Sequence, residues 1–111
     1  MHYLSISFTH KNSTLEIREK LSYPDDENKH ACLKALVAKK SITGAILIST
    51  CNRMEVLANC NDIDEASAEI FDLLSARAGL SVQELKKHAD VFDDSTAIHN
   101  LFSVAASLDS M

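Results

Sequence analysis

Apolar and polar side chains alternate near the start of the chain and then change to a helical spacing. Residues 3–8 alternate in this way, which is typical of a strand with one buried face. Residues 13–16 match a capping box that opens a short helix to about Leu21, and residues 24–26 start a second helix that runs to about Lys40. The apolar positions of the second helix are Leu33, Leu36 and Val37. A strand followed by two helices is therefore expected.

The middle of the chain predicts two strands joined by a short polar corner. Residues 45–49 are apolar on both faces, as expected of a central strand. Residues 55–58 follow the corner at 50–53 and form the predicted antiparallel neighbour. The side chains of the corner are therefore expected at the edge of a sheet.

A third helix and a fourth strand follow. Asp62 or Asp64 begins the helix, and Gly79 ends it in a left-handed conformation. The core positions of this helix are Ala66, Ile70, Phe71, Leu73 and Leu74. Residues 81–84 match a second capping box, after which residues 88–92 form the predicted fourth strand.

The last predicted helix begins near Asp94 and has no stop signal before Met111. Its apolar face contains Ile98, Leu101, Phe102, Ala105 and Leu108. We therefore expect this helix to continue in a longer protein. The order strand, helix, strand, strand, helix, strand predicts an α+β fold, namely a ferredoxin-like four-stranded antiparallel sheet with helices packed on one face.

Composition limits the chain to one domain. A chain of 111 residues with 46% hydrophobic residues can bury a single core, so residues 1–111 are expected to form one unit. Two glycines and one proline leave no room for a flexible linker or a glycine-rich phosphate cradle. Gly44 and Gly79 stand alone, so no dinucleotide site is expected on this chain.

The net charge of −5 argues against a general affinity for nucleic acid, which depends on Lys and Arg displacing counterions from phosphates. Any contact with RNA would be local, and solvated helix edges are the favoured interpretation of the basic side chains. These are His10, Lys11, Arg18, Lys20, Lys34, Lys39 and Lys40. The chain has neither a signal peptide nor an apolar run near the ~20 residues that span a bilayer, so we expect a cytoplasmic protein without membrane contact.

Three cysteines in no regular framework fit a reducing environment. Cys32 has apolar neighbours at helical spacing, so a small buried side chain is expected there. Cys60 lies among polar residues that suggest an exposed turn. A metal site built from these two residues with His30 and Cys51 lacks any familiar ligand spacing, so no metal is expected.

Cys51 is the candidate nucleophile, because it lies between two apolar runs that fix its backbone. Thr50, Asn52 and Arg53 surround its sulfur with hydrogen-bond donors. A nearby cation lowers the pKa of a thiol toward a reactive thiolate. The pattern therefore favours covalent chemistry at this position over core packing.

Three parts of the chain resemble the glutamyl-tRNA reductase family. Residues 49–55, with the sequence STCNRME, are similar to the Cys-centred signature of that family. Residues 9–11 and 15–21 resemble its opening His-Lys and Glu-Ile-Arg-Glu stretch. Residues 99–105 and 108–111 resemble the His-containing helix that leads into its next motif. The matching parts occur in order and span nearly the whole chain.

The resemblance implies the catalytic, glutamyl-tRNA-binding domain of such an enzyme. Cys51 would attack glutamyl-tRNA to form a thioester, which NADPH reduces to glutamate-1-semialdehyde in tetrapyrrole (5-aminolevulinate) biosynthesis. The domains for NADPH and for dimerisation would lie outside these residues, so the isolated fragment is expected to lack reductase activity. The implied partners are glutamyl-tRNA, a second copy of the full-length protein and, as a candidate, the next enzyme of the pathway.

The resemblance also implies roles for the residues beside the thiol. Arg53 would bind a substrate carboxylate through its planar two-donor fork. Its alternative role is an ion pair with Glu55 or Glu16. Thr50 and Asn52 would bond the glutamate or the developing oxyanion, although turn residues of these types equally often bond their own backbone.

Two further site residues come from the end of the chain. The family match makes His99 an active-site residue that polarises the carbonyl, moves a proton or orients the substrate, whereas position alone suggests a partly solvated side chain. Ser110 matches a family substrate contact. His10 and Lys11 lie within reach of the pocket, but a simple strand-to-helix loop is the favoured interpretation.

Two other classes of function fit the residues. The first is a non-catalytic ferredoxin-like ligand-binding or interaction module, because such sheets often bind partners without chemistry. The second is a thiol redox domain in which Cys60, the nearest cysteine in sequence, would resolve Cys51. Preferential alkylation of Cys51 over Cys60 would favour the reductase over the binding module.

Overall fold

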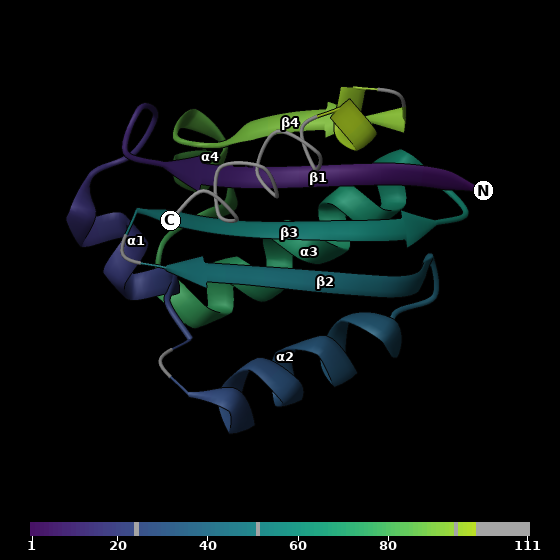
Figure 1. Cartoon of the computed structure of the whole chain (residues 1–111), viewed down its shortest axis with the longest axis horizontal. Helices are drawn as coiled ribbons and strands as arrows, with labels where there is room; N and C mark the ends of the chain where they lie inside the picture. The colour runs from purple at the N-terminus through teal and green to yellow at the C-terminus, as the bar shows by residue number, and fades with distance from the viewer. Residues whose placement is uncertain (24, 51, 95, 100–111) are drawn as a thin grey trace.

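The structure is a computed structural model that describes residues 1–23, 25–50, 52–94 and 96–99. Residues 24, 51, 95 and 100–111 lie outside the described part. The elements in chain order are β1 (His2–Thr9), α1 (Leu15–Leu21), α2 (Asp26–Val37), β2 (Ile42–Thr50), β3 (Arg53–Cys60), α3 (Ile63–Ala78), α4 (Val82–Lys87) and β4 (Asp90–Asp93). Figure 1 shows this succession, which follows the order expected from the sequence.

The four strands form one sheet in the order β2-β3-β1-β4, and every neighbouring pair is antiparallel. This confirms the predicted α+β fold with a four-stranded antiparallel sheet. The prediction that residues 45–49 form a central strand is wrong, because β2 lies at the edge (Figure 1). Ala45 and Leu47 pack against the core, whereas Ile46 between them points the other way and is 52% exposed.

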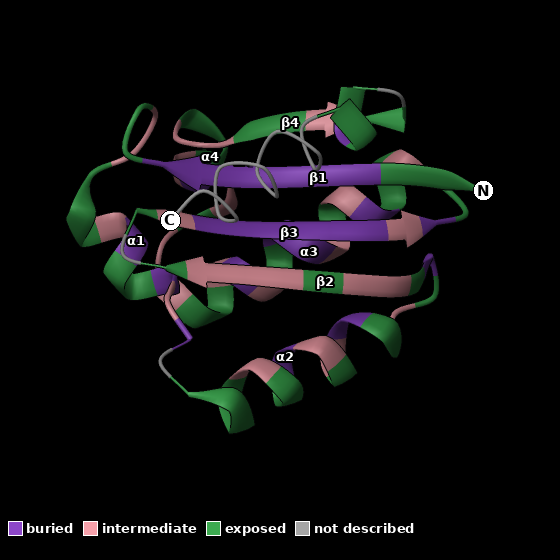
Figure 2. Cartoon of the chain, viewed as in Figure 1, coloured by how far each residue is buried: buried purple, intermediate pink, exposed green. Residues whose placement is uncertain are grey.

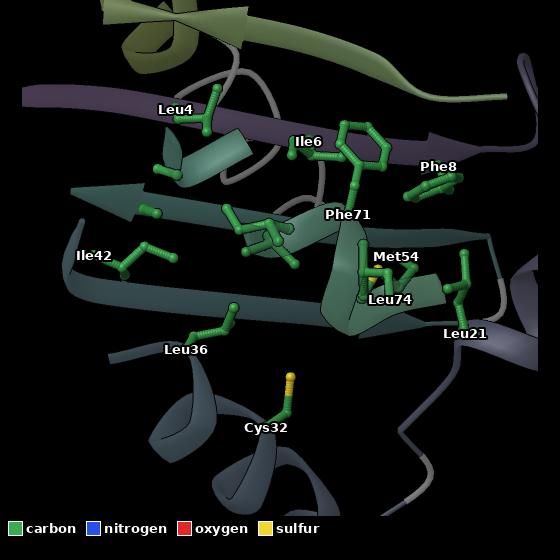
Figure 3. Packing of buried hydrophobic residues seen from close by; sticks show 14 of the residues in the cluster. Leu4, Ile6, Phe8, Leu21, Cys32, Leu36, Ile42, Met54, Phe71 and Leu74 are labelled. Atoms are coloured by element: carbon green, nitrogen blue, oxygen red, sulfur yellow. The ribbon is translucent and has the colours of Figure 1, made fainter. Parts of the chain in front are cut away.

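One face of the sheet packs against the helices. Leu4, Ile6 and Phe8 alternate along β1 and are fully buried against apolar side chains of all four labelled helices. These include Leu21, Leu36, Ile70, Phe71, Leu74 and Leu85. Figure 3 shows Phe71 reaching toward Ile6 and Phe8. Burying each such side chain contributes about 1.5–3 kcal/mol, so this one layer supplies most of the apolar driving force for folding.

Side-chain caps set the starts of the helices. Thr14, one residue after the predicted start of the first capping box, accepts a hydrogen bond from the backbone N–H of Ile17. Asp62, and not Asp64, caps α3, and Ser81 caps α4 as expected. The remaining cap is Asp25, at the start of α2. The caps that the sequence predicts for α1, α3 and α4 thus agree with the structure to within one residue.

The second helix differs from its prediction in length and in its buried side. It ends at Val37 and does not reach Lys40. Val37 is 46% exposed, whereas Cys32 and Leu36 face the core. Figure 3 shows the sulfur of Cys32 directed from α2 toward the sheet, which confirms the expected buried thiol.

The prediction for Cys60 is wrong. Cys60 is the last residue of β3 and is fully buried. It pairs across the sheet with His2 on one side and with Ile42 on the other. The polar residues that suggested a turn at Cys60 form that turn one position later, at Asn61.

The face of the sheet opposite the helices is also enclosed at its centre. The alternation in residues 3–8 predicted one buried face, yet Ser5 and Ser7 are 0% and 1% exposed. Glu55 on β3 is likewise fully buried. Figure 2 shows that burial is concentrated on the central strands β1 and β3. The second face therefore holds polar groups in a largely water-excluded setting.

After β4, residues 96–99 are helical, which agrees with the predicted start of a helix near Asp94. Ala97 is fully buried, whereas Ile98 is 37% exposed. The predicted apolar face therefore lies one position off at this end. Its other expected members, Leu101, Phe102, Ala105 and Leu108, are outside the described residues.

Candidate functional site

The candidate site is built around the corner between β2 and β3. β2 ends at Thr50 and β3 begins at Arg53, and these two residues face each other in the strand register. The hydroxyl of Thr50 donates to the carbonyl oxygen of Arg53 at 3.5 Å, so the alternative in which Thr50 bonds the turn backbone is realised. Asn52 is an exposed turn residue. Cys51 lies outside the described residues.

Arg53 forms an ion pair with a carboxylate inside the sheet. Its Nη1 atom lies 3.2 Å from Oε1 of Glu55, and the side chains are 28% and 0% exposed. The ion pair expected as an alternative therefore exists with Glu55. A guanidinium has five N–H donors, so this contact uses only part of its capacity and also fixes its direction.

Glu55 is anchored in turn by β1. The hydroxyl of Ser7 donates to Oε1 of Glu55 at 2.6 Å. The register pairs Ser7 with Glu55 and Thr9 with Arg53, so all four side chains lie on the face opposite the helices. A hydroxyl bond to a buried carboxylate is charge-assisted and therefore strong. The position of Arg53 is thus set by the pairing of two central strands.

Arg53 lines a polar cavity of about 180 Å³ on this face, which we call the arginine cavity. Its described lining residues are Ser7, Thr9, His10, Lys11, Arg53, Asp90 and Phe92. His10 and Lys11 therefore border the pocket, although a simple loop was the favoured interpretation for them. With two cations and one carboxylate, the arginine cavity suits a small anionic group.

Asn12 holds the loop that carries His10 and Lys11. Its side-chain oxygen accepts from the backbone N–H of Thr9 at 2.7 Å. Its amide nitrogen donates to the carbonyl oxygen of Ser7 at 3.1 Å and to Oδ2 of Asp90 at 3.0 Å. One amide therefore joins the end of β1 to β4, and all three of its partners, Ser7, Thr9 and Asp90, line the arginine cavity.

Arg18, on α1, also holds this loop through hydrogen bonds. Its Nη1 atom donates to the carbonyl oxygens of Thr9 and Ser13 at 3.1 and 2.6 Å. Arg18 is only 8% exposed, so the interpretation of this residue as a solvated helix edge is wrong. Its guanidinium instead donates hydrogen bonds to loop carbonyls after β1.

A second cavity of about 300 Å³ adjoins the same corner from the side of α1 and α2. We call it the α1–α2 cavity. Its described lining residues are Leu15, Arg18, Glu19, Ser22, Tyr23, Lys29, Ser49 and Thr50. The corner therefore separates two cavities, with Thr50 at one and Arg53 at the other.

Comparison with known proteins places this arrangement in a family. The family model described as "Glutamyl-tRNAGlu reductase, N-terminal domain" matches residues 6–111. The chain belongs to this family. It is 62% identical over 111 residues to a glutamyl-tRNA reductase from Sulfurimonas denitrificans, and 48% identical to one from Campylobacter curvus. In both cases all of this chain is covered, against 26% of the relative.

A solved structure agrees with the family assignment. Glutamyl-tRNA reductase from Methanopyrus kandleri is 29% identical, with a TM-score of 0.69 over 98% of this chain and 23% of that protein. The chain thus spans about a quarter of the length of the relatives that it matches. The fold described above is that of a glutamyl-tRNA reductase N-terminal domain.

Four of the six predicted site residues lie in the described part of this glutamyl-tRNA reductase domain. Thr50, Asn52 and Arg53 meet at the corner, and His99 is an exposed helical residue. Cys51 and Ser110 lie outside the described residues. The prediction that they share a site with His99 therefore stays a prediction.

The sequence did not predict several residues that line the arginine cavity or hold its arginine. Glu55 was considered only as an alternative ion-pair partner, although its position two residues after Arg53 places it on the same face of a strand. Ser7, Asp90 and Phe92 come from β1 and β4, and only the pairing of these strands brings them to the cavity. No local signal points to them.

The two described cysteines are unsuited to reactivity. Both are free and buried, and burial raises the pKa of the Cys32 thiol and, helped by Asp94 and Asp62, that of the Cys60 thiol. Cys60 lies at the opposite end of β3 from Arg53, roughly 23 Å away at about 3.3 Å per residue.

This separation excludes the thiol redox interpretation that pairs Cys51 with Cys60. Cys51 precedes Arg53 by two residues, a span of at most about 7.6 Å. A disulfide needs Cα atoms within about 7 Å of each other. Cys60 is therefore out of reach of Cys51 within the folded chain.

The described residues contain neither a metal-ligand cluster nor a membrane-spanning helix. No group of three or more His, Cys, Asp or Glu side chains in that part is arranged to hold a metal ion. No helix there combines the length and the apolar character needed to cross a membrane.

Proposed function

We propose that this chain is the catalytic, glutamyl-tRNA-binding domain of an NADPH-dependent glutamyl-tRNA reductase that acts in tetrapyrrole biosynthesis. The observation that carries the proposal is a guanidinium fixed by a buried carboxylate at a polar cavity, two residues from a cysteine in the family signature. The match to the family over residues 6–111 supports the same assignment.

The reaction begins with attack of the Cys51 thiolate on the carbonyl carbon of the glutamyl ester. The new C–S bond gives a tetrahedral oxyanion, to which the amide of Asn52 donates and to which the hydroxyl of Thr50 donates after it leaves the carbonyl oxygen of Arg53. Collapse of this species breaks the bond to the ribose oxygen, which leaves with a proton and releases the tRNA. His99 serves this step by moving the proton or by polarising the carbonyl. The product is a glutamyl thioester, which is more electrophilic than the oxygen ester.

Arg53 selects the glutamyl group. A carboxylate in the arginine cavity would meet the planar fork of Arg53, with Lys11 as a second cation. A neutral glutamine side chain of the same size offers no charge to this pair of cations. Because Glu55 holds Arg53, little side-chain entropy is lost when the substrate binds. Ser110 is proposed as a further contact to the substrate.

The residues of this chain do not fit a dinucleotide. Gly44 lies within β2 and Gly79 forms the left-handed cap of α3, so neither belongs to a phosphate-binding turn. The NADPH that reduces the thioester is therefore proposed to bind outside these 111 residues.

We further propose a cytoplasmic homodimer of the full-length protein. Its reactive aldehyde product, glutamate-1-semialdehyde, favours direct transfer to the next enzyme of the pathway.

Mass spectrometry of the 111-residue chain after incubation with glutamyl-tRNA tests the proposal. We expect one glutamyl adduct on Cys51, no adduct in Cys51→Ser, an unchanged adduct in Cys32→Ala, and no reduction on addition of NADPH. Absence of the adduct, together with alkylation of Cys51 no faster than that of a free thiol, would instead indicate the non-catalytic ligand-binding module.

Arg53→Lys tests whether Arg53 recognises the substrate carboxylate, and a glutamine ester of the same tRNA is the control. The wild-type chain should prefer glutamyl-tRNA to the same tRNA charged with glutamine, since only the former carries a carboxylate. The Lys variant should lose about tenfold in acylation rate with glutamyl-tRNA and little with the glutamine ester. Equal losses for both esters would show that Arg53 supports the fold and does not read the carboxylate.

A further inference from the structure

The α1–α2 cavity has no role in the chemistry described so far, although it touches the corner that carries Cys51. Ser49 and Thr50, the last two residues of β2, form part of its wall. The arginine cavity begins at Arg53 on the other side of the same corner. The two cavities therefore adjoin the corner at Thr50 and at Arg53 respectively.

The wall of the α1–α2 cavity is held in place by contacts within the protein. The backbone N–H of Tyr23 donates to the hydroxyl of Ser49 at 3.2 Å. Arg77 lies over the Tyr23 ring at 4.2 Å from its centroid and donates to the carbonyl oxygen of Ser22 at 2.6 Å. Tyr23 is only 5% exposed. Contacts with β2 and α3 thus hold this part of the wall in place.

The charges at the α1–α2 cavity differ from those of the whole chain. Arg18 and Lys29 bring two positive charges and Glu19 one negative charge, in a chain with a net charge of −5. Arg18 already bonds loop carbonyls. Lys29 is half-buried, and no ion pair of its ammonium is found within the described residues. An ammonium in this position suits an anion from outside the protein.

The remaining lining groups fit the other parts of a nucleotide. Leu15 is 53% exposed and offers an apolar surface in the wall of the same cavity as Tyr23. The carboxylate of Glu19 can accept from a ribose hydroxyl or an exocyclic amine. A phosphate, a sugar and a flat base thus each find a matching group. The volume of about 300 Å³ lies at the lower end of the range for small-ligand sites.

We propose that the α1–α2 cavity binds the 3′-terminal nucleotide of the aminoacyl-tRNA, with Lys29 at its phosphate, while the arginine cavity receives the amino acid. This inference rests on the proposed function. The ester that Cys51 attacks joins the acyl group to the terminal ribose, so that ribose must lie within a few bonds of the thiol. With the acyl group on the Arg53 side of the corner, the leaving nucleotide has the Thr50 side available.

Acylation of Cys51 in the 111-residue chain provides the main test, with Lys29→Glu and Lys29→Ala as variants. Lys34, an exposed residue one and a half turns further along α2, gives the matched controls Lys34→Glu and Lys34→Ala. Lys29→Glu should raise the half-saturating concentration of glutamyl-tRNA about tenfold, and the Lys34 variants less than twofold. The logarithm of the half-saturating concentration rises with the logarithm of the salt concentration. Lys29→Ala should reduce the slope of this relation by about 0.7, the value for one single-strand phosphate.

A 4-nitrophenyl ester of glutamate separates the two cavities, because it carries the acyl group without a nucleotide. Its acylation rate should be the same in Lys29→Glu, Lys34→Glu and the wild-type chain. An equal loss with this ester would place Lys29 at the acyl group and overturn the proposal. Equal behaviour of the Lys29 and Lys34 variants toward glutamyl-tRNA would overturn it as well.

Binding of uncharged tRNA to the Cys51→Ser chain keeps the inference testable without acyl transfer. Fluorescence anisotropy should show weaker binding for Lys29→Glu than for Lys34→Glu, and removal of the 3′-terminal adenosine from the tRNA should abolish that difference. If the wild-type chain forms no thioester but this pattern holds, the proposed function fails and the nucleotide site stands. If the thioester forms but the pattern is absent, only the nucleotide site fails.

Discussion

Arg53 and Glu55 lie two positions apart on β3, and their side chains meet at 3.2 Å between Nη1 and Oε1. The carboxylate is fully buried and also accepts from Ser7 at 2.6 Å. The guanidinium is partly exposed at the arginine cavity. The buried carboxylate of Glu55 therefore orients the guanidinium of Arg53 at the proposed substrate site.

Replacement of Glu55 by Gln should affect function more than folding. Gln keeps the size of the side chain and an acceptor for Ser7, but it removes the charge that directs Arg53. We expect the free energy of unfolding to fall by about 1–2 kcal/mol, measured by urea denaturation. The half-saturating concentration for Cys51 acylation should rise about tenfold.

Ser7→Ala is the matched control for this substitution. It removes one hydrogen bond to Glu55 and leaves the ion pair with Arg53 in place. Stability should fall by about 1 kcal/mol with little change in acylation. If Glu55→Gln acylates like the wild-type chain, Glu55 has only a structural role.

Asn12→Ala should loosen the loop that borders the arginine cavity. The substitution removes three hydrogen bonds made by one amide, to Thr9, Ser7 and Asp90. We expect a loss of about 1–3 kcal/mol in the free energy of unfolding. Asn28→Ala removes one hydrogen bond from an exposed amide to the carboxylate of Asp25, and it should cost less than about 0.5 kcal/mol. Equal losses of unfolding free energy in the two variants would show that the Asn12 hydrogen bonds do not stabilise the loop.

The stability of the chain should fall at alkaline pH. Burial raises the pKa of Cys32 and Cys60 in the folded state, so the unfolded chain loses these protons first as pH rises. The unfolded state then binds fewer protons than the folded state, and the free energy of unfolding decreases with pH. Burial also raises the pKa of Tyr23, which adds an effect of the same sign at higher pH.

Urea denaturation at pH 7.5 and 9.5 measures this dependence. The wild-type midpoint should be lower at pH 9.5, and the double variant Cys32→Ala, Cys60→Ala should show a smaller difference between the two pH values. A wild-type midpoint that is unchanged or higher at pH 9.5 would contradict the assignment of buried, protonated thiols.

Gly79→Ala and Gly44→Ala form a pair that separates backbone strain from packing. Gly79 has φ 71°, a conformation that costs a residue with a Cβ about 1–2 kcal/mol. At Gly44 an added Cβ would lie 3.7 Å from Nδ2 of Asn59, which is an ordinary contact. Thermal denaturation should show a clear loss for Gly79→Ala and a change within about 0.5 kcal/mol for Gly44→Ala.

Features that depend on a few neighbouring residues could be predicted from the sequence. Asp62, Ser81 and Gly79 set the ends of helices through contacts three or four positions away, and the sequence predicted these roles, with Asp62 as one of two candidates. The corner at Thr50 and Arg53 was found in the same way, because its residues are contiguous and match a family signature.

Features that depend on strand pairing could not be predicted. The residues around Cys60 are typical of a turn. Only its pairing across the sheet with His2 and Ile42 shows that it belongs to a strand. Ser7 and Glu55 are 48 positions apart, and their hydrogen bond exists only because β1 and β3 pair in one register. Period-two alternation identifies which residues share a face, but it does not show that a polar face is enclosed.

The anchoring of Glu55 by Ser7 has a consequence for how such proteins diverge. Loops at the rim of the arginine cavity can change length and composition between species without displacing the guanidinium, since its support comes from the interior of the sheet. Drift in substrate preference would therefore require changes at strand positions, where most replacements impair folding. Redesign toward another acyl group should accordingly begin with residues 7, 53 and 55 together.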